Sequence, residues 1–421
     1  PKPVQKDPVA NDDSYTAIED GEARLEGYLN NDALENNARL EEFDEETENG
    51  GQVTDNRDGS FNYIPAADFT GEDSFTYTIC DSDDNCSTAT VTVNVQDEGA
   101  PQANPDETNA VKNQSITIGD LHENDDLLDE AVIFSVESTT SAGGTAVLND
   151  NGTVTYTPAS GFQGEDTFTY TVCDDDAEAT CSTATVTVQV VESITFSIPS
   201  NLADYYSDLS VSTSTELNYE FISDHTSASQ TTFLEYPDRH DYLYDADEDL
   251  NNPENVILMY TGESRYWEEY QSGSNSYSPQ TFNTEHVYPQ SKLNTEESKN
   301  DLHVLRVADA EVNEARWNYP FTDGSGNNKL IGGNEWFPGD EWKGDVARII
   351  MYVNVRYGDN FTDVGNLELF LKWNIEDPVS DFEIQRNNVI EAAQGNRNPF
   401  IDNPYLATLI WGGTAAENKW E

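Results

Sequence analysis

The sequence predicts a multidomain protein in which two all-β sandwich repeats precede an α+β domain. Three observations lead to this prediction: a segment of about 95 residues occurs twice, both copies alternate apolar and polar residues with period two, and the composition changes near residue 195. With 421 residues, the chain is also too long for one ordinary domain. We therefore expect domains at residues 1–98, 99–193 and 194–421.

The internal repeat is visible by direct comparison of two pairs of blocks. Residues 59–80 (GSFNYIPAADFTGEDSFTYTIC) match residues 152–173 (GTVTYTPASGFQGEDTFTYTVC), and residues 87–95 (STATVTVNV) match residues 182–190 (STATVTVQV). The loop between the two blocks is longer in the second copy. The alternation within the blocks predicts a hairpin of two long strands in each copy.

Each predicted hairpin carries one cysteine on either side of its turn: Cys80 and Cys86 in the first copy, and Cys173 and Cys181 in the second. By strand parity, both cysteines of a hairpin lie on the same polar face, where opposed side chains come close. We expect two local disulfides and hence an oxidising, extracytoplasmic location, with four reduced thiols as the alternative. The sequence begins at Pro1 without a basic and then apolar leader, so we expect any signal peptide to have been removed.

The repeats resemble the cadherin-like and immunoglobulin-like tandem modules of bacterial surface and secreted proteins. The shared patterns are F-x-G-x-D-[ST]-F-x-Y and T-A-T-V-T-V-x-V, within about residues 8–192. The resemblance implies a sandwich fold, and such modules could bind a cell surface or matrix. The acidic turns of the hairpins could hold structural Ca²⁺, but we favour solvated turns because no known ligand spacing is present. The residues concerned are Asp81, Asp83, Asp84, Asp174, Asp175 and Asp176.

The charge of the chain restricts its partners. The chain contains 81 Asp and Glu residues but only 20 Lys and Arg residues, so its formal net charge is −61. Composition alone therefore argues against a nucleic-acid partner, since a polyanion repels a polyanionic surface. The chain is nevertheless 36% hydrophobic and can bury cores, while no apolar run approaches the roughly 18 residues of a membrane-spanning helix. We expect a folded monomer without a membrane span.

The third domain contains all seven tryptophans and no cysteine. Some of its helices can be placed by their caps. Ser380 and Glu383 form a capping box at the start of one helix, which Gly395 should end. A domain that combines such helices with short strands belongs to the α+β class.

Two histidines of the third domain stand in contexts that suggest chemistry. His286 lies in residues 282–291 (FNTEHVYPQS), which read as a short strand closed by a proline. His303 lies in residues 300–306 (NDLHVLR), within a second expected strand. The other three histidines, His122, His225 and His240, are interpreted as structural.

A helix should follow the second strand directly. We expect the strand over residues 302–307 and a helix capped by Asp309. On this helix Asn313, Arg316 and Trp317 are three and four residues apart, so they share a face that could meet the first strand. The expected order is strand, loop, strand, helix.

These segments resemble the endonuclease I family of secreted and periplasmic bacterial nucleases, whose active site is a ββα-metal motif. The resemblance rests on N-T-E-H-V-Y-P-Q-S, D-L-H-V-L-R and V-N-E-A-R-W-N-Y-P-F, with M-Y-T-G upstream and Q-G-N-R-N-P-F-I-D downstream, and it covers most of residues 200–421. In this family the histidine of E-H is the general base. The preceding glutamate binds the metal together with the asparagine of V-N. By position, these residues are His286, Glu285 and Asn313.

These residue types suit the hydrolysis of a phosphodiester. A neutral imidazole can take a proton from the attacking water, and a hard divalent ion can act as a Lewis acid. One carboxylate and one amide oxygen, completed by waters, suit Mg²⁺ better than Zn²⁺, with Mn²⁺ or Ca²⁺ as substitutes. Adjacent side chains of a strand point to opposite faces, however. Either the backbone at Glu285 and His286 is irregular, or the metal lies at the strand edge.

Four further side chains have two interpretations each. Arg316 and Arg306 could neutralise the scissile phosphate, or they could be ion-paired within an acidic domain. His303 could hold a neighbouring group or fill the core, and we favour the structural role. Asn318 could support the metal shell or satisfy the helix end.

The resemblance implies a bacterial, secreted or cell-surface endonuclease that is Mg²⁺-dependent and largely sequence-nonspecific. Its substrate would be DNA, or RNA as well, and its products would carry 5′-phosphates. The alternative is a surface adhesion or matrix-binding protein with a vestigial nuclease domain, against which the intact motif argues. In seawater-like salt, the Debye length falls to a few Å, so repulsion of DNA is screened while a metal-bridged contact persists. We therefore interpret the charge of −61 as salt adaptation, and expect activity to rise with NaCl before it falls.

Overall fold

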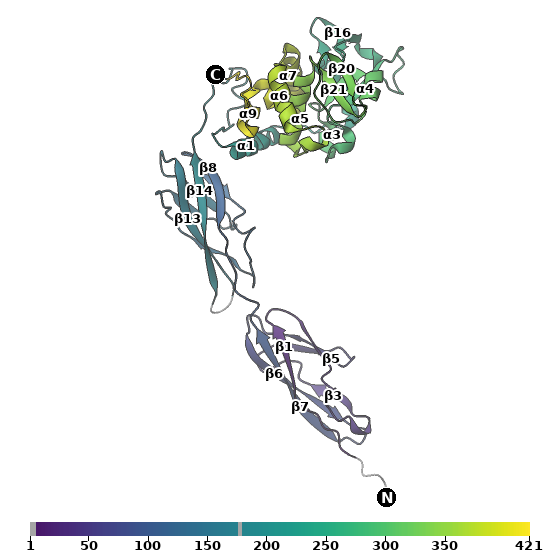
Figure 1. The fold of residues 1–421 in the computed structure, drawn as a ribbon. Coiled ribbons are helices and arrows are strands. Elements are labelled where there is room, and N and C mark those ends of the chain that lie inside the picture. The colour runs from purple at the N-terminus through teal and green to yellow at the C-terminus, as the bar shows by residue number, and fades with distance from the viewer. Residues whose placement is uncertain (1–5, 176–178) are drawn as a thin grey trace. The chain divides into compact units, whose positions relative to one another are not determined.

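The computed structural model describes residues 6–175 and 179–421. The chain divides into two compact units, one ending at Val190 and one running from Val191 to Glu421 (Figure 1). Among the described residues, the first unit contains β-strands and no α-helix, whereas the second unit contains both. The predicted fold class, all-β repeats followed by an α+β domain, is confirmed.

The first repeat is a sandwich of two sheets. The strand orders are β1-β7-β6-β3 and β2-β5-β4, and apolar side chains from both sheets, among them Leu25, Phe61 and Val91, share one core. All strand pairs are antiparallel except β1 with β7, which is parallel. The strands are β1 (Asp13–Ile18), β2 (Ala23–Glu26), β3 (Arg39–Phe43), β4 (Gln52–Asp55), β5 (Ser60–Ile64), β6 (Gly71–Cys80) and β7 (Cys86–Gln96).

The second repeat has the same two-sheet arrangement and its own core. Its strand orders are β10-β13-β14-β8 and β11-β12-β9, and its buried side chains include Ile118, Val154 and Val186. The strands are β8 (Asp106–Val111), β9 (Ile116–Ile118), β10 (Val132–Val136), β11 (Thr145–Leu148), β12 (Val154–Thr157), β13 (Gly164–Cys173) and β14 (Cys181–Val191).

The long hairpin of each repeat follows the predicted period of two. In β6 the odd-numbered residues from 73 to 79 are buried, and the residues between them are more exposed. The register of the hairpins places Cys80 opposite Cys86 and Cys173 opposite Cys181. Both pairs form disulfides, so the predicted pairing is confirmed and the alternative of reduced thiols is wrong.

The acidic turn of the first hairpin is stabilised by its own residues. The carboxylate of Asp81 accepts hydrogen bonds from the side-chain amides of Asn36 and Asn85 and from the backbone amides of Asp83 and Asn85, and these bonds lower its pKa to about 2. Across residues 6–175 and 179–421, no group of three His, Cys, Asp or Glu side chains could hold a metal ion. Asp176 of the second turn lies outside the described residues. These contacts favour the solvated turn, and Ca²⁺ in the repeats stays a prediction.

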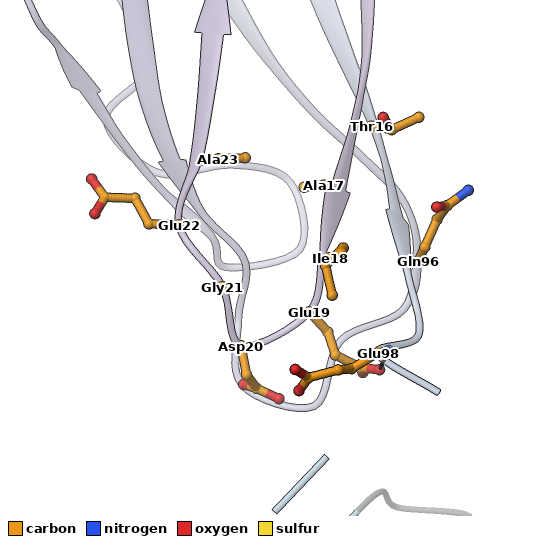
Figure 2. A pocket seen from close by; sticks show the side chains of 10 residues that line it. All are labelled: Thr16, Ala17, Ile18, Glu19, Asp20, Gly21, Glu22, Ala23, Gln96 and Glu98. Atoms are coloured by element: carbon orange, nitrogen blue, oxygen red, sulfur yellow. Dashed lines mark hydrogen bonds between the residues drawn. The ribbon is translucent and has the colours of Figure 1, made fainter. Parts of the chain in front are cut away.

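A hollow of about 560 Å³ lies at one end of the first repeat. Figure 2 shows the side chains of Glu19, Asp20, Glu22 and Glu98 around it, and the Glu19 carboxylate accepts a hydrogen bond from the backbone amide of Glu98. None of the described residues that line the hollow is basic. Because carboxylates repel a phosphate backbone, this hollow does not suit a nucleic acid.

The second unit is built around α5 (Lys343–Tyr357), which is buried along nearly its whole length. Gly358 ends this helix in the left-handed conformation, with φ of 73°. Helices α1 and α6 pack against it (Figure 1), and the surrounding apolar core includes Trp373 and Phe400. The other helices are α1 (Thr215–Ala228), α2 (Arg239–Ala246), α3 (Glu296–Asn300), α4 (Ala310–Arg316), α6 (Leu367–Glu376), α7 (Asp381–Gln394), α8 (Pro399–Asp402) and α9 (Tyr405–Trp411).

The strands of the second unit form small sheets. Their orders are β15-β16-β17, β18-β19 and β20-β21. In the described ranges of the chain, no helix combines the length and the apolar character needed to cross a membrane. The strands are β15 (Glu248–Asp249), β16 (Asn252–Ile257), β17 (Ser264–Tyr266), β18 (Phe282–His286), β19 (Leu305–Asp309), β20 (Asn327–Ile331) and β21 (Glu335–Gly339).

The helix caps lie where the sequence predicts them. The side chain of Asp309 accepts hydrogen bonds from the first backbone amides of α4. Ser380 and Glu383 form the capping box of α7, and Gly395 ends that helix with φ of 94°. These predictions are confirmed, and the order β18, β19, α4 reproduces the expected strand, loop, strand, helix.

The second strand of this motif starts later than predicted. The expected strand covers residues 302–307, whereas β19 begins at Leu305. The residues just before β19 form a turn at Asp301. The carboxylate of Asp301 accepts a hydrogen bond from the backbone amide of His303, and its backbone carbonyl accepts one from the amide of Val304. These local hydrogen bonds compete with strand pairing and displace the strand toward α4.

Candidate nuclease site

Glu285 and His286 are the last two residues of β18. This strand pairs with β19 along its whole length without a shift of register. The irregular backbone that would bring both side chains to one face is therefore wrong. Glu285 contacts Arg316 of α4 on one face of the strand, and His286 contacts Tyr236 on the other.

The carboxylate of Glu285 is buried between two side chains. Its Oε1 accepts a hydrogen bond of 2.8 Å from the hydroxyl of Tyr260 and lies 3.5 Å from Nε of Arg316. Glu285 is 4% exposed, and burial raises its pKa to about 7 despite the arginine, because the charged form loses its hydration. A further positive charge beside this carboxylate, such as a divalent ion, would stabilise the ionised form.

His286 is held in one orientation through its ring. Nε2 lies 3.0 Å from the carbonyl oxygen of Lys299, and the ring stacks on Tyr236 with 5.7 Å between centroids. Because a carbonyl oxygen only accepts hydrogen bonds, Nε2 carries the proton of the neutral ring and Nδ1 carries the lone pair. Burial lowers the pKa of His286 to about 4, so the ring is neutral at pH 7. Nδ1 is therefore able to accept a proton.

Asn313 lies at the outer edge of β18, away from β19. The backbone carbonyl of Val307 accepts a hydrogen bond from the amide of Met259, which is not part of β18. Val307 therefore points its peptide groups away from β18, and its register partner Thr284 points its own away from β19, as the two residues of a non-hydrogen-bonded antiparallel pair do. Nδ2 of Asn313 donates to this outward carbonyl of Thr284 at 3.2 Å and to Oδ1 of Asn283 at 2.8 Å. Both bonds use the nitrogen, and no donor from the described residues bonds to Oδ1 of Asn313.

Glu285 and Asn313 offer oxygen atoms that suit a hard cation. The backbone amide of His286 also interacts with the Glu285 carboxylate. Mg²⁺ prefers oxygen ligands and keeps several waters, so one carboxylate and one amide oxygen are sufficient protein ligands. The oxygen atoms of Glu285 and Asn313 therefore suit Mg²⁺, or Mn²⁺ or Ca²⁺ in its place. Of the two alternatives predicted from the sequence, this corresponds to a metal at the edge of the strand.

The two arginines considered as phosphate ligands are both buried. Arg316 is 0% exposed, and its guanidinium pairs with Glu285 and donates to three backbone carbonyls. Arg306, also 0% exposed, pairs with Asp247 and Asp345 at 3.0 Å each. Neither guanidinium is available to a phosphate in this arrangement. For both arginines, we therefore adopt the alternative interpretation, in which the side chain is ion-paired within the domain.

His303 and Asn318 occupy structural positions. Nε2 of the buried His303 lies 3.3 Å from the carbonyl oxygen of Asn396, and its ring packs on Tyr352. Asn318 is exposed, and its backbone carbonyl accepts a hydrogen bond from Nζ of Lys292. Neither side chain contacts Glu285 or His286 through any hydrogen bond in the described part of the chain.

Backbone strain surrounds the Glu285 carboxylate. Within the described residues of the second unit, Tyr260 (φ 72°) and Trp317 (φ 53°) are the non-glycine residues with positive φ. Tyr260 binds Glu285, and the carbonyl of Trp317 accepts a hydrogen bond from Arg316. Such conformations cost about 1–3 kcal/mol each and collect at functional sites.

The positive φ of Trp317 also ends α4. The side chain of Trp317 is 67% exposed, so the prediction that it meets the first strand is wrong.

Several residues near the site were missed by sequence reasoning. Tyr260 lies in the M-Y-T-G segment that supports the resemblance, but nothing in that segment indicates a contact with Glu285. Tyr236, Arg239 and His240 lie far from β18 in sequence, and tertiary packing brings Tyr236 against His286, Arg239 against Thr284 and His240 into the wall of the same hollow. The positive charge of Arg239 in a strongly acidic chain is the one signal that could have drawn attention to this segment.

Two family models match this chain. Residues 213–405 match the family model of endonuclease I, and residues 5–94 and 97–189 each match the model of the bacterial Ig domain. Among solved structures, mouse cadherin-23 EC22–24 is 16% identical and covers 44% of this chain and 65% of that chain, with a TM-score of 0.21.

The curated relatives include extracellular nucleases. The chain is 39% identical over 235 residues to an extracellular ribonuclease of Bacillus amyloliquefaciens, covering 49% of this chain and 78% of the relative. The extracellular ribonuclease of Bacillus subtilis is 39% identical over 212 residues, with 44% and 72% covered. An extracellular deoxyribonuclease of Aeromonas hydrophila is 32% identical over 112 residues, with 24% and 49% covered. The chain belongs to the endonuclease I family, and two bacterial Ig-like repeats precede its nuclease domain.

Proposed function

We propose that this protein is a secreted bacterial endonuclease that hydrolyses phosphodiester bonds with the help of Mg²⁺ and largely without sequence preference. The observation that carries the proposal is the end of β18, where a neutral imidazole, whose Nδ1 has no hydrogen-bond partner among the described residues, follows the buried carboxylate of Glu285 in the chain and Asn313 is bonded to the same strand. The extracellular relatives and the two disulfides support secretion. Attachment to a cell surface through the repeats is a further part of the proposal.

His286 acts as the general base in this proposal. Its Nδ1 accepts a proton from the attacking water, and the Lys299 carbonyl stabilises the resulting imidazolium through Nε2–H. Glu285 and Asn313 would hold the cation, which supplies Lewis acidity at the phosphate when it is bound. Attack at phosphorus with O3′ as leaving group produces a 5′-phosphate end. Arg316 and Tyr260 keep the Glu285 carboxylate in place.

The substrate class follows from the relatives. They include both ribonucleases and deoxyribonucleases, so we propose DNA as substrate and RNA as a second one. The alternative, an adhesion protein with a vestigial nuclease domain, is less well supported because Glu285, His286 and Asn313 are all present and held by neighbouring groups.

Replacing the base tests the proposed mechanism. His286→Ala should lower the rate of plasmid cleavage by at least about 10², as expected for loss of a general base. The exposed His122 of the second repeat provides the matched control, and His122→Ala should cleave like the wild type. The measurement is the loss of supercoiled plasmid over time in Mg²⁺, with a parallel series in chelator that should show no cleavage. Cleavage by His286→Ala at the wild-type rate, or cleavage that chelator leaves unchanged, would contradict the proposal.

Arg316 is proposed as a positioning residue rather than a phosphate ligand. Arg316→Gln leaves the buried Glu285 without its partner, which costs about 3–5 kcal/mol and should lower the melting temperature of the nuclease unit by about 10 °C. Tryptophan fluorescence reports on this unit alone, because all seven tryptophans lie in it. The half-exposed Arg265, paired with Glu263 and Asp309, is the control, and Arg265→Gln should shift the melting temperature much less. An unchanged melting temperature with a large loss of rate would instead favour a phosphate contact for Arg316.

Salt adaptation is the remaining part of the proposal. Residues 193–421 contain 39 acidic and 14 basic residues, so the nuclease unit itself carries 39 − 14 = 25 excess negative charges. Screening of this charge should increase the initial rate as NaCl is added, until weakened contacts with the phosphate backbone reverse the trend. Initial rates at fixed Mg²⁺ across a NaCl series test this. An enzyme that is fastest in salt-free buffer is not salt-adapted.

A further inference from the structure

A hollow of about 340 Å³ lies beside His286, on the same face of β18. Thr284, which shares this face with His286, lines the hollow, and so does Tyr236, on which the His286 ring stacks. The remaining wall comes mainly from α2 and from the segment before β18. The hollow is therefore adjacent to the proposed general base.

Aromatic rings form much of the wall. Tyr244 and Tyr270 stack on each other with 5.4 Å between centroids, and His240 packs on Tyr270 at 5.1 Å. These three rings and Tyr236 are half-buried, so part of each remains accessible from the hollow. Aromatic side chains in a polar hollow are the usual platform on which unpaired bases stack.

Arg239 is the one arginine or lysine among the described residues that line the hollow. Its guanidinium lies 3.6 Å above the Tyr236 ring, Nε donates to Oγ1 of Thr284 at 3.1 Å, and Nη1 donates to the carbonyl of Tyr236. Nη2 has no hydrogen-bond partner among the described residues. The guanidinium is thus fixed in place with one end free.

Arg239 also differs from the other arginines of the nuclease unit in its charge environment. No described carboxylate lies within 4.0 Å of its guanidinium, although the unit is strongly acidic. Every other arginine of the unit has such a partner: Arg265, Arg306, Arg316, Arg348, Arg356, Arg386 and Arg397. A fixed arginine without a carboxylate partner is suited to a phosphate.

The hollow continues toward the proposed cation ligands. Gln271 and Asn283 line both this hollow and a second one, whose wall includes Asn313 together with Glu311 and Glu314. Asn283 also accepts the hydrogen bond that orients the Asn313 amide. The two hollows therefore share part of their walls, with Arg239 in the first and Asn313 in the second.

We propose that Arg239 and the aromatic rings around Tyr270 form a subsite for one unpaired nucleotide next to the scissile phosphate, an inference that rests on the proposed nuclease function. The base stacks on the tyrosine rings, and Arg239 binds the neighbouring phosphate. A base can enter the hollow only when it is neither paired nor stacked in a duplex. The enzyme therefore binds single-stranded nucleic acid more tightly than a duplex of the same sequence.

Binding without cleavage tests the subsite independently of the chemistry. The full chain, in chelator, is titrated into a fluorescein-labelled oligothymidylate, alone or paired with its complement, and anisotropy is recorded. Tyr270→Leu and Arg239→Gln should each weaken binding of the single strand about tenfold, within the range for loss of one stacked base or one phosphate contact. Tyr270→Phe keeps the ring and should bind like the wild type, because the described residues make no hydrogen bond to this hydroxyl. Arg265→Gln removes an arginine that is already paired, and should also bind like the wild type.

The salt dependence separates the two roles. Removing a phosphate contact reduces the slope of log K against log salt by about 0.7 for a single strand, so Arg239→Gln should show this reduction and Tyr270→Leu should not. Tryptophan fluorescence melts confirm that each variant is folded.

The outcomes distinguish the subsite from the nuclease function. If the wild type binds the duplex as tightly as the single strand, or if folded Arg239→Gln and Tyr270→Leu bind like the wild type, the subsite is overturned even when plasmid is cleaved. If the wild type shows the predicted binding but cleaves no plasmid in Mg²⁺, the subsite is supported and the nuclease proposal fails.

Discussion

Neighbouring side chains of a regular strand must point to opposite faces, and the nuclease site of this protein depends on that constraint. β18 keeps its register with β19 to its last residue, so Glu285 and His286 diverge. Each side chain is then fixed by different partners, Tyr260 and Arg316 for the glutamate and Lys299 for the histidine. In the proposed mechanism, groups from both faces act on one phosphate at the outer edge of the strand, where the amide of Asn313 is bonded to the carbonyl of Thr284.

The positions of the arginines show how a strongly acidic chain can be compatible with a nucleic-acid substrate. Most arginines of the nuclease unit are buried and paired with carboxylates, as Arg306 is with Asp247 and Arg348 is with Glu383. They are held in the interior and contribute little to the surface field, which remains negative. In the proposed mechanism, attraction of a phosphate comes from a bound cation and from arginines that have no carboxylate partner among the described residues, as Arg239 has none.

Local signals in the sequence predicted the fold. Period-two alternation, paired cysteines and helix caps such as Ser380 depend on near neighbours, and the structure agrees with them. The strand shift at Asp301 and the exposure of Trp317 depend on turn hydrogen bonds and backbone strain that a pattern does not reveal. The burial of Arg316 and the aromatic hollow around Arg239 arise from tertiary packing, because their partners are distant in sequence.

The proposed mechanism requires Glu285 and Asn313 to hold a divalent cation together at the outer edge of β18. A crystal structure of His286→Ala grown with Mn²⁺ and a short oligonucleotide, with anomalous scattering used to locate the metal, tests this requirement. We expect one strong anomalous peak bonded to the Glu285 carboxylate and to Oδ1 of Asn313, beside a phosphate of the oligonucleotide. A peak bonded to neither residue, with the oligonucleotide bound elsewhere on the chain, would rule out this cation site.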